Sequence, residues 1–507
     1  MNRSFRRLPL APVIALLFAA WLPARAAEPS PAADRWAPYF RPGLLRALIL
    51  SGRCNHDWRT STPFLRQLLN ESGRFDVRVE EAVDGITPDT LAPYDVLVMD
   101  YGGPRWPAST EKAVEDFVRG GKGLVLVHGA VYHFSGLDVI TDGHRAVGLK
   151  EPPWPAFREM AGCGWDRAPE RGYHGARHTF PVKMVIRDHP ITAGLPETLP
   201  ATDELYHGMT VLPHARVLAT AFDAPERNGT GRDEPMLVVT QIGQGRVFTT
   251  VLGHEVAGMW EDAFRIPFVR GTEWAASGRV TLPTDAGLPH APARPIRTLV
   301  VTGGHDYETS FYTVFESDPT LVWDHEPNNE SAFARDLRPR YDVLVLYDLS
   351  KDLSEKGRAN LKAFVEAGRG VVVLHHALAD YPGWEWWWKE VVGGRYVLAA
   401  EPGMPASDYK HDEWMPIEPA GAHPITAAVG PLRLYDETYK GVWIAPNVKP
   451  LLRTTNPTSN PIIGWVSAYP SARVVCLQPG HGAPSHRHPA YRQLVHNAIA
   501  WAAKRID

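Results

Sequence analysis

Cysteine is scarce in this chain of 507 residues, which contains only Cys54, Cys163 and Cys476. Three cysteines allow at most one disulfide bond, so the fold cannot depend on a dense disulfide framework. None of the three lies in a CxxC spacing, which argues against a cysteine-based zinc site or a redox motif. We therefore expect an ordinary hydrophobic core to hold the protein together.

A strong charge of either sign is also absent. The formal net charge is −4, charged residues make up 22% of the chain, and Lys and Arg form no run. Proteins that bind nucleic acid usually carry a basic patch, so we expect no nucleic acid partner and instead a small ligand that is neutral or anionic. The hydrophobic content of 44% is ordinary for a globular protein.

Beyond the N-terminus, no hydrophobic run is long enough to cross a bilayer, so we expect no stable membrane insertion. Residues 1–26 follow the secretory order, with arginines, a short apolar run and Ala24-Arg25-Ala26 as a cleavage site. The alternative is an uncleaved membrane anchor, but the apolar run is shorter than the roughly 20 residues that a span needs. The pattern predicts a signal peptide at 1–26 and an exported protein, periplasmic or extracellular, that begins near Ala27.

The most informative feature that is present is an internal repeat. The string HDWRTSTPFLRQLL has a counterpart 249 residues later, and further motifs return in the same order, such as GKGLVLVHGA as GRGVVVLHHA and DELYHGM as DETYKGV. Solenoid repeats have periods of about 20–50 residues, so this long period indicates two globular domains. We predict a leader at 27–43, a first domain at 44–283, a proline-rich linker at 284–296 and a second domain at 297–507.

Short β-rich runs alternate with longer amphipathic segments in both repeats. Runs such as YDVLVMD and GLVLVHG are apolar without alternation, as expected for strands covered on both faces. TPFLRQLLNESG and STEKAVEDFVRGG have helical spacing. This βαβ order predicts two tandem α/β domains, each with a mainly parallel, doubly wound sheet in a flavodoxin-like, three-layer arrangement.

Histidines follow predicted strands in both repeats. Ligands bind beyond the carboxyl ends of the strands in open parallel sheets, so these positions are candidates for a functional site. His178 and His411 lie at matching places before the HPIT motif. Alternatively, any single histidine caps a turn by hydrogen bonding, but the set returns in both copies. The candidates are His56, His128, Glu204 and His254 in the first repeat, and His305, His375, Glu437 and His481 in the second.

Imidazole and carboxylate groups are typical ligands of zinc, manganese and iron. We expect a divalent metal such as Zn²⁺ or Mn²⁺ on His128, Glu204 and His254, with His56 as a further ligand, and no nucleotide cofactor. A metal with an open coordination position would polarise a carbonyl or acidify a bound water. Without a metal, the same groups could serve as general acid and base near neutral pH.

A nucleophile is missing from the place where many α/β enzymes carry one. Enzymes with a nucleophile elbow have Ser or Cys directly after a central strand. The chain has His128-Gly129 at this position in the first repeat and His375-His376 in the second. Covalent acyl transfer is therefore disfavoured.

At these residues the chain resembles the ThuA-like (trehalose utilisation) family, over nearly its whole length after the leader. The first repeat carries the resemblance in NHDWRTSTPFLRQLL, FVRGGKGLVLVHGA, DHPITAGLP and VFTTVLGHEVAGMWEDAFR. The resemblance implies a fold similar to the class I glutamine amidotransferases, with the nucleophilic cysteine replaced by histidine, and a role in sugar metabolism. Carried over residue by residue, the family's polar site would be His56, His128, Glu204 and His254.

The second repeat departs from this pattern outside its four polar residues. Lys440 replaces His207, Tyr307 replaces Trp58, and the GHE of the first repeat becomes GHG. We therefore expect the first repeat to carry most of the activity.

Two functions are compatible with the sequence and the resemblance. The leading hypothesis is an exported, carbohydrate-active enzyme that acts on a disaccharide or a keto-glycoside by metal-assisted hydrolysis or elimination. The alternative is a sugar-binding protein without catalysis, in which histidines and tryptophans hold the ligand. The substrate class in both rests on the resemblance.

Overall fold

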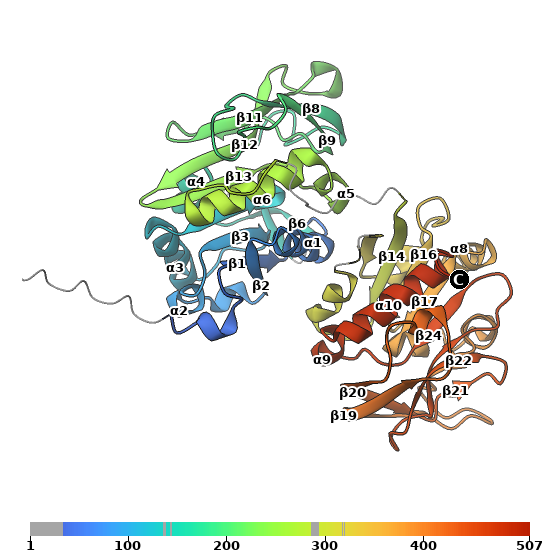
Figure 1. The fold of residues 1–507 in the computed structure, drawn as a ribbon. Coiled ribbons are helices and arrows are strands. Elements are labelled where there is room, and N and C mark those ends of the chain that lie inside the picture. Colours follow the sequence, from blue (N-terminus) through green and yellow to red (C-terminus); the bar gives the residue numbers. More distant parts are fainter. Residues whose placement is uncertain (1–33, 135–137, 142–143, 285–293, 317, 319) are drawn as a thin grey trace, which may run out of the picture. The chain divides into compact units, whose positions relative to one another are not determined.

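The computed structural model describes residues 34–134, 138–141, 144–284, 294–316, 318 and 320–507 (Figure 1). The predicted signal peptide, residues 27–33 of the predicted leader and most of the predicted linker lie outside the described residues. The chain up to Pro42 forms a unit apart from Gly43–Asp507 and contains the short 3-10 helix η1 (Ala37–Tyr39). None of the helices in the described part is long and apolar enough to cross a membrane.

The first repeat builds a mixed sheet whose strand order, among its described residues, is β2-β1-β3-β4-β13-β12-β11-β8-β9. The strands from β2 to β13 run parallel, and from β13 to β9 neighbouring strands are antiparallel. The bounds are β1 (Leu45–Gly52), β2 (Phe75–Glu80), β3 (Val96–Tyr101), β4 (Gly123–Val127), β8 (His178–Met184), β9 (Thr198–Asp203), β11 (Arg216–Phe222), β12 (Asp233–Ile242) and β13 (Gly245–Thr250).

The second repeat has the same topology. Its sheet has the order β15-β14-β16-β17-β24-β23-β22-β19-β20 among the described residues, with the parallel strands again at the β15 end. The bounds are β14 (Ile296–Gly303), β15 (Leu321–Glu326), β16 (Val343–Asp348), β17 (Gly370–Leu374), β19 (Asp408–Pro419), β20 (Leu432–Lys440), β22 (Lys449–Thr454), β23 (Ile462–Val466) and β24 (Val474–Leu477).

Short strand pairs and helices complete the two repeats. The paired short strands are β5 (Asp138–Thr141) with β6 (His144–Lys150), β7 (Cys163–Gly164) with β10 (Thr210–Val211), and β18 (Gly394–Arg395) with β21 (Trp443–Ile444). The α-helices are α1 (Trp58–Glu71), α2 (Pro88–Leu91), α3 (Ala108–Arg119), α4 (Pro155–Ala161), α5 (Val256–Met259), α6 (Asp262–Ser277), α7 (Asn329–Phe333), α8 (Glu355–Glu366), α9 (Ala483–His486) and α10 (Pro489–Ala502). The remaining short helices are η2 (Val83–Gly85), η3 (His128–Val131), η4 (Pro225–Arg227), η5 (Thr309–Phe315), η6 (His375–Ala379), the π-helix η7 (Trp386–Val392) and η8 (Pro424–Thr426).

Two adjacent residues of β13 show that helices cover both faces of the first sheet. A Cβ atom on Gly245 would collide with the carbonyl oxygen of Val118 in α3. The next residue, Arg246, donates from Nε to the carbonyl oxygen of Trp274 in α6 at 3.0 Å. Because successive residues of a strand face opposite sides, α3 and α6 lie on opposite faces, which gives the three layers (Figure 1).

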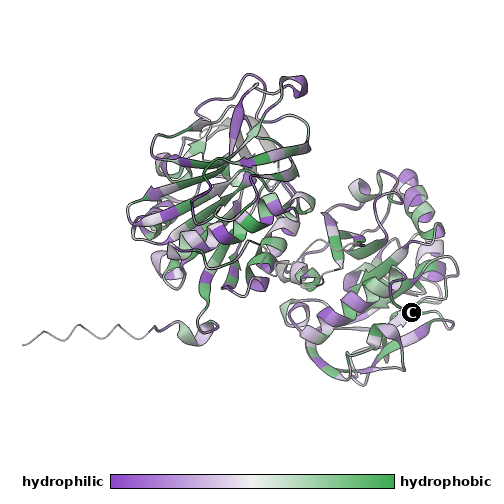
Figure 2. Ribbon diagram, turned by 45° about the horizontal axis from the view of Figure 1, so that its top comes forward, coloured by the Kyte–Doolittle hydropathy of each residue, from purple (hydrophilic) through white to green (hydrophobic). Residues whose placement is uncertain are grey.

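The apolar cores follow from the same alternation. In β17, Val372 and Leu374 belong to one hydrophobic cluster, whereas Val371 and Val373 belong to another. The hydropathy colouring shows apolar strands inside each sheet (Figure 2). A strand that is buried on both faces needs apolar residues at every position, which is why these runs show no alternation in the sequence.

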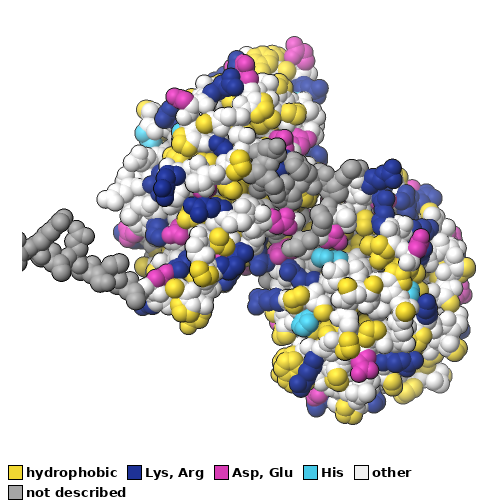
Figure 3. Space-filling view, in the orientation of Figure 1, with side chains coloured by type: hydrophobic (Ala, Val, Ile, Leu, Met, Phe, Trp, Pro, Cys, Tyr) yellow, Lys and Arg dark blue, Asp and Glu magenta, His cyan; other side chains and the backbone are white. Residues whose placement is uncertain are grey.

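Charged side chains of both signs are interspersed on the face visible in Figure 3. Pairs such as Arg119 and Glu159, whose Nη2 and Oε2 atoms are 2.6 Å apart, are about half exposed. Exposed pairs of this kind contribute about 0–1 kcal/mol to stability. The stability of the two folds therefore comes mainly from the cores.

The structure confirms the predicted fold class, since each of the two tandem domains has a mixed sheet with a parallel half of five strands. The antiparallel half of each sheet is an addition to the prediction. The two repeats differ after their first strands, because the stretch after His305 is the 3-10 helix η5, whereas the longer α-helix α1 follows His56. The aromatic and β-branched residues of η5 have lower helix propensity than the Leu, Arg and Gln residues of α1, and Pro319 follows soon after it.

Candidate functional site

A central parallel strand of each sheet ends at a histidine. His128 follows β4 and begins η3, and His375 follows β17 and begins η6. Their backbone φ angles are 43° and 49°, in the left-handed region that costs a residue other than glycine about 1–2 kcal/mol. This sharp turn places both imidazoles at the carboxyl ends of the parallel strands, as a nucleophile elbow would place its nucleophile.

Hydrogen bonds fix the orientation of the His128 ring. Its Nδ1 lies 2.7 Å from the carbonyl oxygen of Val251, which can only accept, so Nδ1 carries the proton and donates. The lone pair is then on Nε2, where it accepts from the Tyr206 hydroxyl at 2.9 Å. A neutral imidazole held in this way is oriented to serve as a metal ligand or a base.

Glu204 is the centre of the first site. Its Oε2 atom lies 3.1 Å from His254 Nδ1, 3.7 Å from His128 Nε2 and 3.4 Å from His174 Nε2. Burial raises the pKa of Glu204, but contacts with His128 and His254 outweigh burial and hold the pKa well below its ordinary value. Burial lowers the pKa of His254, and the Glu204 charge more than reverses this. Both shifts favour an anionic carboxylate beside a protonated imidazole.

His56 completes the group. Its ring centroid lies 4.6 Å from that of His128 and 5.0 Å from that of His254. Burial, together with the neighbouring His128 and His254, lowers the pKa of His56 well below its ordinary value, which favours the neutral ring with one nitrogen lone pair available. The ligand atoms of His56, His128, Glu204 and His254 all lie within 4.8 Å of one another, so the structure brings all four predicted residues together.

Cys54 also lies beside this group, with Sγ 3.2 Å from His56 Nδ1. Burial, with a contribution from Asp100, raises the pKa of the thiol to about 12. A thiol with so high a pKa is a poor nucleophile because the thiolate is the reactive form. All three cysteines, each within the described residues, are free and buried.

An aspartate next to the glutamate holds the site together in both repeats. Asp203 accepts from the backbone N–H groups of Gly253 at 2.7 Å and of His254 at 3.2 Å. Asp436 accepts in the same way from Gly480 at 2.7 Å and His481 at 2.9 Å. The two acidic residues of each pair therefore have different roles. The aspartate fixes the loop, and the glutamate faces the histidines.

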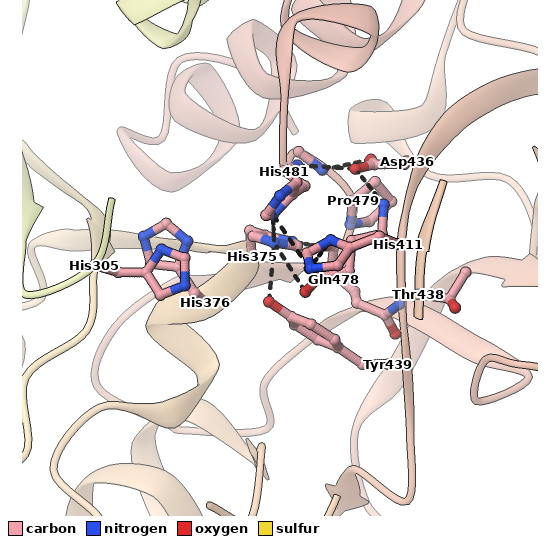
Figure 4. A network of polar contacts seen from close by, with 12 residues as sticks. His305, His375, His376, His411, Asp436, Thr438, Tyr439, Gln478, Pro479 and His481 are labelled. Carbon is pink, nitrogen blue, oxygen red and sulfur yellow. Dashed lines mark hydrogen bonds and ion pairs between the residues drawn. The ribbon is translucent and has the colours of Figure 1, made fainter. Parts of the chain in front are cut away.

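The second repeat contains a similar polar group, shown in Figure 4. His375 Nδ1 donates to the carbonyl oxygen of Gln478 at 2.8 Å, and its Nε2 lies 2.9 Å from the Tyr439 hydroxyl and 3.1 Å from His481 Nδ1. Burial raises the pKa of Glu437, despite His481 and His411. The ligand atoms of His375, Glu437 and His481 lie within 4.8 Å of one another.

His305 lies apart from that group. Its ring stacks on His376, with centroids 4.5 Å apart and planes at 20° (Figure 4). The position of His376 is occupied by Gly129 in the first repeat, where an added Cβ would lie 2.7 Å from His56 Nδ1. A side chain at the position of Gly129 and His376 therefore leaves no room for the histidine after the first strand to turn inward. This explains why His56 joins the polar group of the first repeat, whereas His305 lies apart from that of the second.

We expect Gly129→Ala to displace His56 and to weaken metal binding by the first repeat about 10-fold or more, because a Cβ contact of 2.7 Å cannot be accommodated without movement. Metal titration of the purified variant tests this, with Gly85→Ala as the control, since an added Cβ there meets no atom within 4 Å. Unchanged affinity in Gly129→Ala would show that His56 is not needed.

The structure also shows site residues that the sequence interpretation leaves out. His174 contacts Glu204, whereas His178 does not, since its Nδ1 donates to the carbonyl oxygen of Ala176 at 3.0 Å. His411, in contrast, reaches Glu437 with Nδ1 at 2.7 Å from Oε2, because a register shift between Lys410 and Glu413 redirects it. The tyrosines that contact His128 and His375 return in the DELY and DETY motifs, and this recurrence is the signal that could have found them.

The donor set of the first repeat fits a divalent metal. Two ligand atoms of a tetrahedral zinc ion with bonds of about 2.0–2.1 Å lie about 3.3 Å apart. The distances from Glu204 Oε2 to His254 Nδ1 and to His128 Nε2 are 3.1 and 3.7 Å. The residue types and their spacing therefore suit zinc or a related ion.

Comparisons with known proteins agree with the repeat. The family model ThuA, described as trehalose utilisation, matches residues 46–275 and again 298–502. A solved ThuA-like protein from Parabacteroides merdae is 29% identical, with 47% of this chain and 92% of that chain covered and a TM-score of 0.40. A second from Bacteroides uniformis is 18% identical, with 46% and 94% covered and a TM-score of 0.34. A beta-galactosidase from Rahnella sp. R3 is 16% identical, with 50% and 33% covered and a TM-score of 0.31. No curated protein shows significant similarity.

Proposed function

Because the chain belongs to the ThuA (trehalose utilisation) family, we propose that its carbohydrate-related role is enzymatic and resides in the first repeat. The substrate is a disaccharide or its keto derivative, and the reaction is metal-assisted elimination or hydrolysis of the glycosidic bond. The observation that carries the proposal is the convergence of three imidazoles and one carboxylate within 4.8 Å at the carboxyl ends of parallel strands. The secretory pattern of residues 1–26 supports an exported location.

His128, Glu204 and His254 would hold the metal, with His56 as a further ligand. When bound, a divalent ion supplies electrophilic polarisation of a hydroxyl or keto oxygen. The protein contributes orientation, because Val251 fixes His128 and Asp203 fixes the loop of His254.

His174 is placed to move a proton. Its Nδ1 donates to the carbonyl oxygen of Gly175 at 2.9 Å, so the lone pair on Nε2 faces Glu204 and the site. On a keto-glycoside, His174 would take the proton from the carbon between the ketone and the anomeric carbon. The electron pair of that C–H bond forms a double bond as the glycosidic C–O bond breaks, and the leaving alcohol takes up a proton. Water addition to the double bond completes a hydrolysis.

Acyl transfer is not the proposed chemistry. The strand-end position holds His128, and Cys54 has a pKa of about 12. A protonated, buried thiol cannot provide the activated nucleophile that covalent catalysis requires.

The test combines metal analysis with turnover of a 3-keto-disaccharide by the mature chain without a histidine tag. We expect product formation in the presence of Mn²⁺ or Zn²⁺, its loss after chelation, and at least about 100-fold slower turnover in His174→Ala. His178→Ala is the matched control, because the Nδ1 of that histidine donates to the carbonyl oxygen of Ala176 and none of the ion pairs among the described residues joins it to Glu204. Sugar binding without product would instead support the non-catalytic function.

A further inference from the structure

The second repeat holds three metal-ligating side chains at the spacing that a tetrahedral ion requires. His375 Nε2 lies 3.1 Å from His481 Nδ1 and 3.6 Å from Glu437 Oε1, and His481 Nδ1 lies 3.4 Å from Glu437 Oε2. Ligand atoms around a tetrahedral zinc ion are about 3.3 Å apart. We propose that the second repeat binds its own divalent cation, of the zinc class, through His375, Glu437 and His481.

The orientation of His375 supports this ligand set. Its Nδ1 proton is committed to the carbonyl oxygen of Gln478, so the lone pair is on Nε2. This atom lies 3.6 Å from Glu437 Oε1 and 3.1 Å from His481 Nδ1, the ring beside it in Figure 4. A carbonyl partner on the outer nitrogen is the usual arrangement for a metal-bound histidine. The site is also sheltered, since His375 is fully buried and Glu437 is 5% exposed.

Two neighbouring residues hold the ligands in place. Asp436 accepts from the backbone of His481 and thereby fixes the loop of that ligand. His411 Nδ1 lies 2.7 Å from Glu437 Oε2, an ion-pair contact that orients the carboxylate. We assign His411 as a positioning residue, because 2.7 Å is shorter than the spacing of about 3.3 Å between two ligands on one tetrahedral ion.

The second site differs from the first in its number of ligands. Because the His376 side chain occupies the space into which His305 would have to turn, His305 does not join His375, Glu437 and His481. Three protein ligands leave one tetrahedral position for water or a substrate oxygen, which is the arrangement of catalytic zinc sites. Two imidazoles and one carboxylate favour zinc and related ions over calcium or magnesium, which prefer oxygen ligands. This inference does not depend on the substrate proposed for the first repeat.

The experiment measures metal stoichiometry on the untagged full chain after chelation and equilibration with Zn²⁺ alone. We expect two equivalents in the wild type, one in His375→Ala, one in His128→Ala, and none in the double variant. Glu437→Gln keeps the size of the side chain and removes its charge, so it replaces His375→Ala if that variant does not fold. It should also bind one equivalent. His411→Ala should keep two equivalents and lower the affinity of the second site about 10–100-fold.

The histidines that precede α1 and η5 provide the matched control. His56→Ala should weaken the first site, whereas His305→Ala should leave both equivalents unchanged. One equivalent in the wild type that is lost in His128→Ala and retained in His375→Ala and Glu437→Gln would overturn the inference and leave the first site standing. If the wild type binds one equivalent and only the variants of the second repeat lose it, the second site is supported. The proposed function of the first repeat would then have no metal.

Discussion

His128→Ala should remove the metal of the first repeat and slow turnover at least about 100-fold. The side chain is buried, and its Nε2 faces Glu204 and Tyr206. The substitution also leaves the Val251 carbonyl oxygen without its donor, which costs about 1–3 kcal/mol. We therefore expect the melting temperature to fall by several degrees as well. Metal analysis, turnover and thermal unfolding of one preparation measure all three effects.

His128→Gly separates the site from the backbone. Because φ at this position is 43°, glycine avoids the cost of about 1–2 kcal/mol that alanine retains in the left-handed region. We expect the glycine variant to lose metal as completely as the alanine variant and to unfold at a higher temperature. Normal metal content and turnover in both variants would reject the site around Glu204.

The strands and the first site could be predicted because their signals are local. The run GLVLVHG has no polar residue before His128, so both the buried strand and the position of the histidine at its end are readable from the sequence. His254 and Glu204 recur at matching places in both repeats, which marked them as candidates without any knowledge of contacts.

The rest depends on contacts between segments that are far apart in the sequence. Whether a histidine after the first strand can turn inward is decided by the residue after the central histidine, which is Gly129 in one repeat and His376 in the other. The choice between His174 and His178 depends on strand register. Neither the repeat pattern nor the hydrophobic pattern contains this information.

A buried pair of aspartates makes the stability of the second repeat depend on pH. Asp348 and Asp380 contact each other in the second repeat and are 0% and 1% exposed. Asn329 donates to Asp348, Tyr381 donates to Asn329, and the Ser350 backbone N–H donates to Asp380 at 2.7 Å. None of the salt bridges among the described residues provides a cation to either carboxyl. Burial raises the pKa of Asp348 to about 7, and burial with the Asp348 charge raises the pKa of Asp380 well above its ordinary value.

The second repeat should therefore lose stability as the pH rises from about 4 to about 7. In the unfolded chain both carboxyls ionise near their ordinary pKa of 3.8, whereas burial in the folded state raises the pKa of Asp348 to about 7 and that of Asp380 well above its ordinary value. Stability from the retained proton is fully present below the unfolded pKa and is lost as the pH approaches the folded pKa. A shift of about three pKa units corresponds to about 4 kcal/mol. Urea unfolding at several pH values between 4 and 8 measures this loss.

Asp380→Asn should flatten that pH dependence, because the amide can donate a hydrogen bond to Asp348 while its oxygen still accepts from Ser350. Asp352→Asn is the matched control, since that carboxylate of the same repeat is 75% exposed and should leave the pH dependence unchanged. The first repeat has Tyr101 and His133 at the corresponding positions, so it lacks this acid pair. An equally steep pH dependence in Asp380→Asn and the wild type would show that the pair does not hold a proton.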